Sequence, residues 1–386
     1  MYSRVTLSPT EESFRSELRA FYQQHVDPGW RGRHATLTEL AAYLRQWDRT
    51  LHANGWGAPG WPREFGGRNA SAIERAIFAE ELVRFNAPEG LGFLGKRLVA
   101  PILMRHGSSE QKRHIDAILR GDEVWCQGFS EPDAGSDLTS LRTRAQLERD
   151  EWVVSGQKVW TTYAQFADWV LLLVRTGAPD SRERGISVLL VNMASPGISV
   201  RPITTMTGSS EFNEVIFDSV RVPAHHLVGD VDGGWPMVRE VLQYERSADH
   251  CLARFADIRR SFETTARCVG GLPDNRDCHE DRLGRQYARV FAIQLMTTDY
   301  LVRQQRNSIP AGLESVLKLY TTEVWRGLGD EQALLWGEAL VDSGGEQQVE
   351  DFMQSRHYTI SAGTSEIQRN QIASRMLHMP SGRSVA

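Results

Sequence analysis

The period of the hydrophobic residues changes twice along this chain, and these two changes limit the folds it can adopt. Up to about residue 122 apolar residues recur at helical spacing, as Phe14 and Leu18 do. From Trp125 to about residue 223 short runs alternate apolar and polar residues, which is the period of β-strands. After Gly234 long amphipathic helical patterns return. This order predicts an α+β protein.

The changes of period also suggest domain boundaries. We expect an all-helical N-terminal domain over residues 1–122, a middle antiparallel β-barrel or sandwich over 123–233, and a helical C-terminal domain over 234–386. The expected helices span about 9–26, 37–53, 71–85, 98–119 with a break at Gly107, 235–268, 282–307, 313–340 and 348–355. The expected strands span 152–154, 159–161, 169–175, 186–193, 198–203 and 214–222.

Composition excludes several classes of protein. The 44 basic residues are outnumbered by 49 acidic ones, giving a net charge of −5, and no basic block suggests a nucleic-acid partner. The four cysteines form no Cys-x-x-Cys pair, so we expect reduced thiols, no disulfide and no structural metal. No signal segment is evident and no run approaches the roughly 18 apolar residues of a membrane helix. We therefore expect a cytoplasmic protein without membrane partners.

The stretch from Trp125 to Thr162 combines two features that suit a planar ligand. Residues 130–137 form a polar loop in which Gly and Ala leave backbone N–H groups open to an anion or a polar ring edge. The following residues alternate around an expected Ser155-Gly156 turn and deliver Trp160 and Thr162 to the same face of a strand. Either feature alone is ordinary, because such loops are mostly turns and a strand Trp is mostly core.

Together and in this order, the two features resemble the flavin-binding core of the acyl-CoA dehydrogenase family, whose typical forms read T-E-P-x-A-G-S-D and K-x-W-I-T-N. Residues 55–67 resemble the family's G-W-x-x-P-x-W-P-x-E-x-G-G linker, and residues 206–215 are also similar to a family segment. The resemblance implies that the C-terminal domain is a four-helix bundle. It also implies a flavin-dependent enzyme that oxidises an acyl-CoA or acyl-carrier thioester to the 2,3-enoyl form and reduces an electron-transferring flavoprotein.

Such an oxidation needs a carboxylate base to remove a proton next to the thioester carbonyl. In one branch of the family this Glu directly precedes Gly-Thr, where this chain has Ala362. In another branch it lies in a Leu-x-x-Glu-Arg context, which Leu242 to Arg246 match. The resemblance therefore assigns the base to Glu245 and places Tyr244 and Arg246 beside the substrate. The alternative is that Glu245 forms only a solvated surface ion pair.

The resemblance also assigns the remaining contacts. Ala362 would offer its backbone N–H to the thioester oxygen. The residues matched to the FAD cofactor are Phe129, Ser130, Ser136, Trp160, Thr162, Thr364 and Glu366, with Ser136 also at the substrate edge.

Two family elements are missing. The Arg-x-x-Phe-Gly motif, which in the family anchors the pyrophosphate from a neighbouring subunit, is matched only in part at residues 280–284. The Gln-x-x-Gly-Gly-x-Gly element is absent, and other residues stand in its place around 334–337. We therefore expect the adenosine half of FAD to be held differently or by another partner chain. The apolar surface of the long helices after Trp235, more than one chain would cover, further predicts a homo- or heterotetramer of family type.

Two other functions stay open. The first is a flavin monooxygenase or lyase on the same fold, which would not need Glu245 as a base. The second is a non-catalytic subunit of a heteromeric dehydrogenase. The length and branching of the acyl chain cannot be inferred from these residues.

Overall fold

The computed structural model describes residues 7–30, 36–245, 248–270, 276–336 and 346–380. Backbone contacts divide the chain into two compact units. The first, here called unit 1, comprises Met1–Gln24, Ser71–Ala87 and Arg246–Ala386, and the second, unit 2, comprises His25–Ala70 and Pro88–Glu245. The N-terminal helices are thus shared between the two units.

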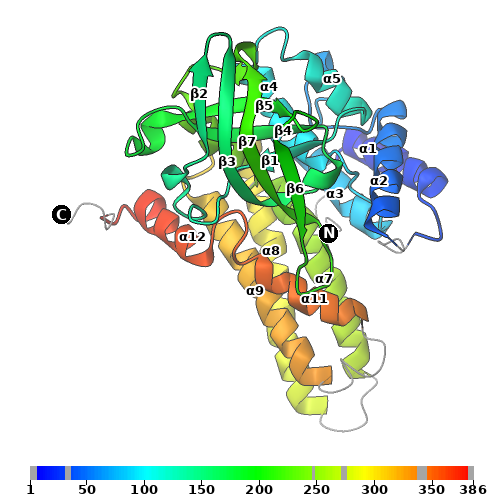
Figure 1. The fold of residues 1–386 in the computed structure, drawn as a ribbon. Coiled ribbons are helices and arrows are strands. Elements are labelled where there is room, and N and C mark those ends of the chain that lie inside the picture. The colour runs from blue at the N-terminus through cyan, green and yellow to red at the C-terminus, as the bar shows by residue number, and fades with distance from the viewer. Residues whose placement is uncertain (1–6, 31–35, 246–247, 271–275, 337–345, 381–386) are drawn as a thin grey trace. The chain divides into compact units, whose positions relative to one another are not determined.

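Unit 1 is helical. Its elements are α1 (Pro9–His25), α3 (Ala72–Arg84), α7 (Ala248–Gly270), α8 (Arg276–Gln305), α9 (Leu313–Trp336), α11 (Glu346–His357), α12 (Ser365–Gln371) and the π-helical turn η7 (Ile372–Met376). The long helices α7, α8, α9 and α11 lie side by side (Figure 1). Buried apolar residues between α7, α8 and α9 form their core, among them Ile258, Ile293 and Leu328.

The helices of unit 2 precede and follow its sheet. They are α2 (Leu37–Ala53), the π-helical turn η2 (Gly95–Val99), α4 (Ala100–His106), α5 (Arg113–Arg120) and α6 (Gly234–Glu245). The 3-10 turns are η1 (Arg63–Phe65), η3 (Leu138–Ser140), η4 (Ala164–Phe166), η5 (Arg182–Gly185) and η6 (Ala224–His226). Thr36 caps α2 in a reciprocal box with Glu39, which satisfies free N–H groups at the start of the helix.

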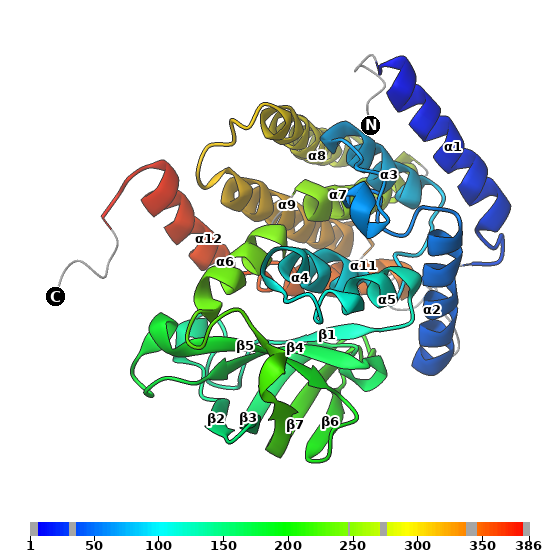
Figure 2. The ribbon, with the colours of Figure 1, turned by 90° about the horizontal axis from the view of Figure 1, so that it is seen from above.

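One eight-stranded sheet forms the rest of unit 2. Its strands are β1 (Trp125–Gly128), β2 (Arg144–Glu148), β3 (Glu151–Thr162), β4 (Trp169–Arg175), β5 (Ile186–Asn192), β6 (Ile198–Ile203), β7 (Phe212–Pro223) and β8 (Leu227–Val228). They follow the order β6-β7-β3-β2-β4-β5-β8, and β1 pairs with β4. Helices α4, α5 and α6 lie along one face of the sheet (Figure 2).

The expected helix, strand, helix order and the α+β class are confirmed, with three corrections. The sheet is not purely antiparallel, because β1 runs parallel to β4. The short strands β1, β2 and β8 were not predicted. The helix expected over 235–268 is two helices, since α6 ends at Glu245 and α7 begins at Ala248.

The expected Ser155-Gly156 turn is also wrong. Both residues lie inside the single strand β3, where the register with β7 shifts between Val154 and Gly156. Gly156 has a φ of 154°, and a Cβ atom there would lie 2.6 Å from the Thr143 Cα. A glycine that suggests a turn in the sequence thus permits a β-bulge and a close backbone contact.

Two further findings concern the expected absences. Within the described ranges, no helix combines the length and apolar character that crossing a bilayer requires. Cys126 is a free, fully buried thiol, and burial raises its pKa. The side chains of Cys251, Cys268 and Cys278 lie outside the described residues.

Replacing Gly156 with Ala should destabilise unit 2. The added methyl group would overlap the backbone of Thr143, and such overpacking costs about 1–3 kcal/mol. The midpoint of urea unfolding should therefore fall. The control is Gly284→Ala in α8, where a Cβ meets nothing within 4 Å and the exchange should stabilise the helix. Equal midpoints for the two variants would contradict this account of the bulge.

Candidate functional site

A buried ion pair joins the polar loop of residues 130–137 to strand β3. Lys158 Nζ lies 2.8 Å from Glu131 Oε1 and donates a hydrogen bond of 3.0 Å to the Phe129 carbonyl oxygen. The Lys158 side chain is 0% exposed and that of Glu131 7%. Glu131 also accepts hydrogen bonds from the backbone N–H groups of Arg142 (2.6 Å) and Thr143 (2.8 Å). Both charges are therefore held by several partners.

Burial and pairing act against each other in this ion pair. Burial lowers the pKa of Lys158 to about 8, although the nearby Glu131 raises it. Burial alone would raise the pKa of Glu131, but the Lys158 charge and the hydrogen bonds to the carboxylate outweigh it and hold that pKa below its ordinary value. Both groups are therefore charged at neutral pH.

The ion pair also sets the positions of predicted site residues. The Val159 N–H donates to the Ser130 carbonyl oxygen at 2.9 Å, next to the contact between Lys158 and Phe129. The structure thus brings Phe129 and Ser130 beside the strand residues that precede Trp160. These contacts link two motifs that are almost 30 residues apart in sequence.

A second β-bulge turns the Trp160 side chain outward. Lys158 pairs with Val215 and Thr161 pairs with Asn213, so β3 has one extra residue there. Trp160 has a φ of 61° and is 58% exposed, whereas Thr161 is buried. In a regular strand Lys158 and Trp160 would share a face. The extra residue instead places the lysine inside and the indole outside.

The outer side of this bulge carries an exposed aromatic ring. The exposed Trp160 ring is supported at its edge by Phe212, with ring centroids 6.1 Å apart. Thr162 is half-buried, and its neighbour Thr161 points into the core, so Trp160 and Thr162 both lie away from the core. A ring face beside a hydroxyl and a fixed loop is the combination of groups that an isoalloxazine ring would need.

Ser136 lies apart from these groups on the exposed part of the loop. Its neighbour Asp137 accepts a 2.6 Å hydrogen bond from Arg182, which ties the loop to η5. A Cβ on Gly135 would meet nothing within 4 Å. The loop is therefore fixed at its two ends and open in the middle.

Ala362, Thr364 and Glu366 belong to unit 1. Ala362 has a φ of 54° and Gly363 a φ of 96°, so the chain makes a left-handed turn here. Thr364 follows as the cap of α12, accepting a 3.2 Å hydrogen bond from the Ile367 N–H. Glu366 is exposed and lies 3.6 Å from Arg369.

The assigned base falls at the end of α6. The side chains of Tyr244 and Glu245 and the whole of Arg246 lie outside the described residues. In the sequence, Glu245 follows the buried Val238 and Val241 at helical spacing.

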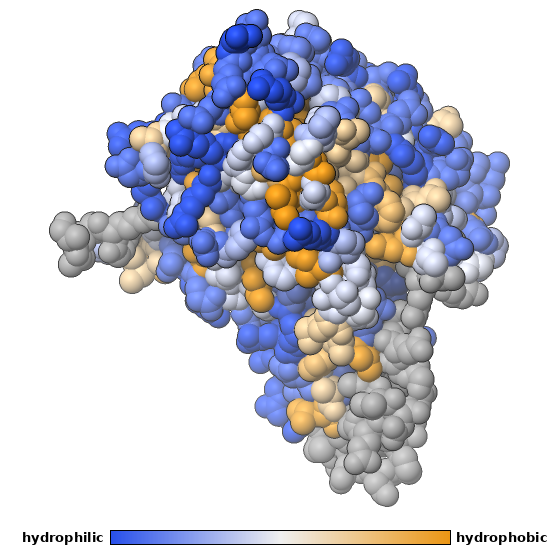
Figure 3. All heavy atoms as spheres, in the orientation of Figure 1, coloured by the Kyte–Doolittle hydropathy of each residue, from blue (hydrophilic) through white to orange (hydrophobic). Residues whose placement is uncertain are grey.

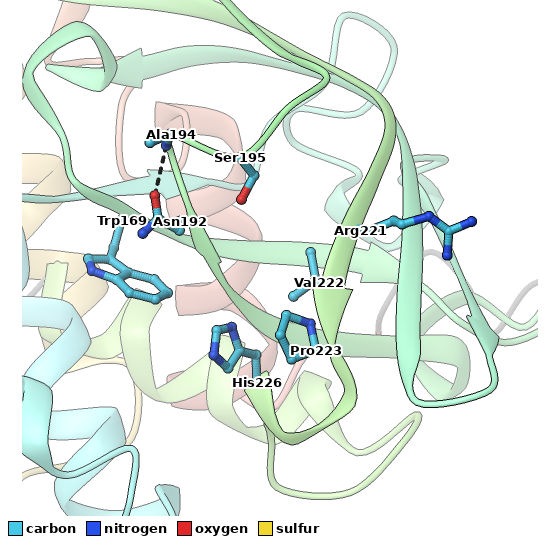
Figure 4. A pocket seen from close by; sticks show the side chains of 8 residues that line it. All are labelled: Trp169, Asn192, Ala194, Ser195, Arg221, Val222, Pro223 and His226. Atoms are coloured by element: carbon cyan, nitrogen blue, oxygen red, sulfur yellow. Dashed lines mark hydrogen bonds between the residues drawn. The ribbon is translucent and has the colours of Figure 1, made fainter.

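A separate pocket of about 370 Å³ opens at the far end of the sheet (Figure 4). Trp169 and His226 line it with Val222 and Pro223 from the end of β7, while the Arg221 side chain extends away from them (Figure 4). The His226 ring faces the Leu190 carbonyl through Nδ1 at 3.0 Å, and burial lowers its pKa.

This pocket is not the predicted flavin site. In the β3–β7 ladder Pro223 pairs with Glu151, whereas Phe212 pairs with Thr162 at the opposite end. Eleven residues of strand, at about 3.3 Å each, separate the two ends. None of the predicted site residues lines the pocket.

Sequence reasoning missed Glu131 and Lys158 as partners. Both belong to the motif segments, but their side chains face the interior and not a ligand. A signal was present: Lys158 continues the inward alternation of Trp152 and Val154, and a charged residue at an inward strand position requires a buried partner.

Removing either partner of the buried pair should destabilise the chain strongly. Lys158→Met and Glu131→Gln each leave a buried group without its partner, which typically costs about 3–5 kcal/mol. The double variant should lose less free energy of unfolding, measured with urea, than the two single variants lose together. As a control, Arg142→Gln breaks an exposed 3.6 Å pair with Asp133 and should cost about 1 kcal/mol or less. Strictly additive losses would show that the two side chains are not coupled.

Comparisons with known proteins identify the family of the chain. Residues 8–122, 126–220 and 232–377 match the N-terminal, middle and C-terminal domains of acyl-CoA dehydrogenase. The acyl-CoA dehydrogenase IpdE1 of Mycobacterium tuberculosis is 34% identical over 387 residues, covering 96% of this chain and 98% of the relative. IpdE1 of Mycolicibacterium smegmatis is 36% identical over 355 residues, covering 87% and 88%.

Solved structures give the same result. The ChsE4-ChsE5 complex from Mycobacterium tuberculosis contains a chain that superimposes with a TM-score of 0.84 at 30% identity, covering 97% of this chain and 99% of the other. Because family domains match along nearly the whole sequence, the chain belongs to the acyl-CoA dehydrogenase family and is an FAD-dependent acyl-CoA dehydrogenase.

Proposed function

We propose that this chain oxidises a saturated acyl thioester to the 2,3-enoyl thioester, with Glu245 as the base. The observation that carries the proposal is the outward Trp160 beside Thr162, fixed to the Phe129–Ser130 segment by the buried Lys158–Glu131 pair. Bound FAD would supply the hydride acceptor. Trp160 would pack against the flavin ring, while Thr162 and Ser130 would hydrogen-bond its polar edge.

The residues of the chain would handle the proton. Glu245 would take the proton next to the carbonyl, and the Ala362 N–H would donate a hydrogen bond to the thioester oxygen as negative charge grows there. Two features support Glu245: the residue before Gly363 is an alanine, and Glu245 follows the buried Val238 and Val241 at helical spacing in the sequence. An apolar surrounding would raise the pKa of its carboxyl toward the working pH.

We further propose that the substrate carries a bulky acyl group on CoA. A solved neighbour described as the Tcur3481-Tcur3483 steroid ACAD aligns with a TM-score of 0.84 at 28% identity, covering 97% of this chain. A steroid-derived acyl-CoA is therefore the first substrate class to test. Electrons would pass to an electron-transferring flavoprotein, as the family resemblance implies.

Replacing Glu245 with Gln should abolish the reaction without preventing binding. Glutamine keeps the size of the side chain but cannot accept a proton, so flavin reduction should slow by several orders of magnitude. Anaerobic mixing of the assembled enzyme with straight-chain and steroid-derived acyl-CoAs, followed by flavin absorbance, measures this rate. Adding Ala362→Glu to the variant moves a carboxylate to the family's other base position and should restore part of the rate.

Three outcomes would contradict the proposal in different ways. If Glu245→Gln reduces the flavin at the wild-type rate, Glu245 is not the base. If an acyl-CoA does not bleach the wild-type flavin anaerobically and the reaction instead requires oxygen and a separate reductase, the chemistry is that of a monooxygenase. Chain that stays colourless with added FAD would favour a non-catalytic subunit.

We also propose that the chain works in an oligomer, with an identical or a related partner. On α8, Tyr287 (58% exposed), Phe291 and Leu295 (56% exposed) follow at four-residue intervals and form an apolar stripe. Hydrophobic residues, coloured orange, are also exposed among hydrophilic ones on the face of the molecule that carries the sheet (Figure 3). The ChsE4-ChsE5 structure is a complex of two different chains, and this chain lacks the two family elements named above, which supports a heteromer.

Charges in the stripe should weaken the assembly. The double variant Tyr287→Glu and Leu295→Glu places carboxylates on the apolar face of α8, and burying them unpaired in an interface is costly. Light scattering should show a wild-type mass well above 43.5 kDa and a smaller mass for the variant. Leu147→Glu, on an equally exposed leucine of β2, is the control that should not change the mass. A wild-type monomer would contradict the proposal.

A further inference from the structure

Lys318 is a buried lysine of α9 that the proposed function does not use. Only 3% of the residue is exposed, and its Nζ donates a 2.8 Å hydrogen bond to the Gly363 carbonyl oxygen. A charged side chain is costly to bury, so its retention at this place needs a reason. The group that it holds belongs to the left-handed turn beside Ala362.

Gln368 holds the same turn from the other side. This residue of α12 is fully buried, and its Nε2 donates to the Ala362 carbonyl oxygen at 3.1 Å and to the Gly363 carbonyl oxygen at 3.2 Å. Two side chains, from two different helices of unit 1, therefore converge on two successive carbonyl groups.

These contacts fix the direction of the neighbouring N–H groups. A trans peptide unit points its N–H away from its C=O. Holding the carbonyls of Ala362 and Gly363 toward Lys318 and Gln368 thus turns the N–H groups of Gly363 and Thr364 the opposite way. The Ala362 N–H precedes these two peptide units, and its direction depends on the same turn.

The turn needs such support because it is strained. A φ of 54° at Ala362 is a conformation that residues with a Cβ adopt at a cost, and it persists only where surrounding contacts hold it. We propose that Lys318, together with Gln368, is a positioning residue for the reaction, keeping the Ala362–Thr364 backbone directed at the thioester oxygen. The proposal rests on the proposed function, since it concerns the hydrogen bond to that oxygen.

Lys318 would act by fixing the turn, so that the Ala362 N–H keeps its direction toward the thioester oxygen. This hydrogen bond matters more as negative charge develops on the thioester oxygen than in the bound substrate. The limiting rate of flavin reduction should therefore depend on Lys318 more than substrate affinity does.

The experiment compares Lys318→Met, Lys318→Arg and Thr322→Val in the assembled enzyme. Methionine keeps the apolar length but cannot donate, and arginine restores a charged donor. Thr322 is a matched buried control on the same helix, whose hydroxyl donates to the carbonyl oxygens of Lys318 and Leu319. For Lys318→Met, anaerobic mixing with an acyl-CoA should give a limiting rate lower by about 10²-fold, with a dissociation constant within about threefold of wild type. Arg should recover part of the rate, and Thr322→Val should not change it.

A second measurement reports on the carbonyl itself. Octanoyl-CoA labelled with ¹³C at the thioester carbonyl is bound to enzyme whose flavin has been chemically reduced, so that it cannot be oxidised. A hydrogen bond lowers the carbonyl stretching frequency, so isotope-edited infrared spectra should show a higher frequency in Lys318→Met than in wild type. A merely structural role for the lysine would lower stability without moving this band. If Lys318→Met does not fold, Gln368→Met removes the other two hydrogen bonds and should shift the band in the same direction.

The outcomes separate the two proposals. If wild-type flavin is not bleached by any acyl-CoA, the proposed function fails and the role of Lys318 fails with it. If the wild type is bleached and the Lys318→Met and Gln368→Met variants retain both its rate and its carbonyl frequency, only the positioning role is overturned.

Discussion

The buried pair of Lys158 and Glu131 is the interaction on which the middle of the chain depends. Burying two charges is expensive, and such a pair contributes little net stability compared with apolar residues of the same size. Its effect is geometric. It fixes the polar loop of residues 130–137 to strand β3. The contacts lie next to Phe129, Ser130 and Trp160, which are assigned to the flavin.

Unit 1 also contains a buried lysine that donates a hydrogen bond to a backbone carbonyl oxygen. A buried lysine of α9 contacts the backbone of the Ala362–Gly363 turn, much as Lys158 contacts the Phe129 carbonyl. In both places a long cationic side chain reaches through apolar surroundings to a main-chain oxygen. A backbone segment that must present N–H groups to a ligand has its carbonyls satisfied from behind, and lysine supplies a strong donor at the end of an apolar stem.

Much of the fold could be predicted because its signals are local. The helical spacing of Phe14 and Leu18 and the apolar run of β4 indicate their elements without reference to the rest of the chain. The failures have a common cause, since they depend on contacts distant in sequence. β1 exists because β4 pairs with it, and Gly156 continues a strand because the Thr143 backbone crosses beside it.

The candidate site likewise contains residues that the sequence predicts and residues that only the structure reveals. Phe129, Ser130, Trp160 and Thr162 could be named from their motifs, and the mismatch at Ala362 directed attention to Glu245. The partners that hold these residues could not be found so easily. Nothing near Lys318 in sequence points to a turn more than 40 residues later, and only the packing of α9 against α12 brings them together.

The extra residue in β3 has a consequence for how related sequences should be aligned. It lets a two-residue step from Lys158 to Trp160 cross from the inside of the sheet to the outside. A relative that keeps this two-residue spacing but lacks the bulge would place the aromatic ring in the interior. An alignment of related sequences should therefore keep the register of β3 against β7, because the motif letters alone do not show which face the ring occupies.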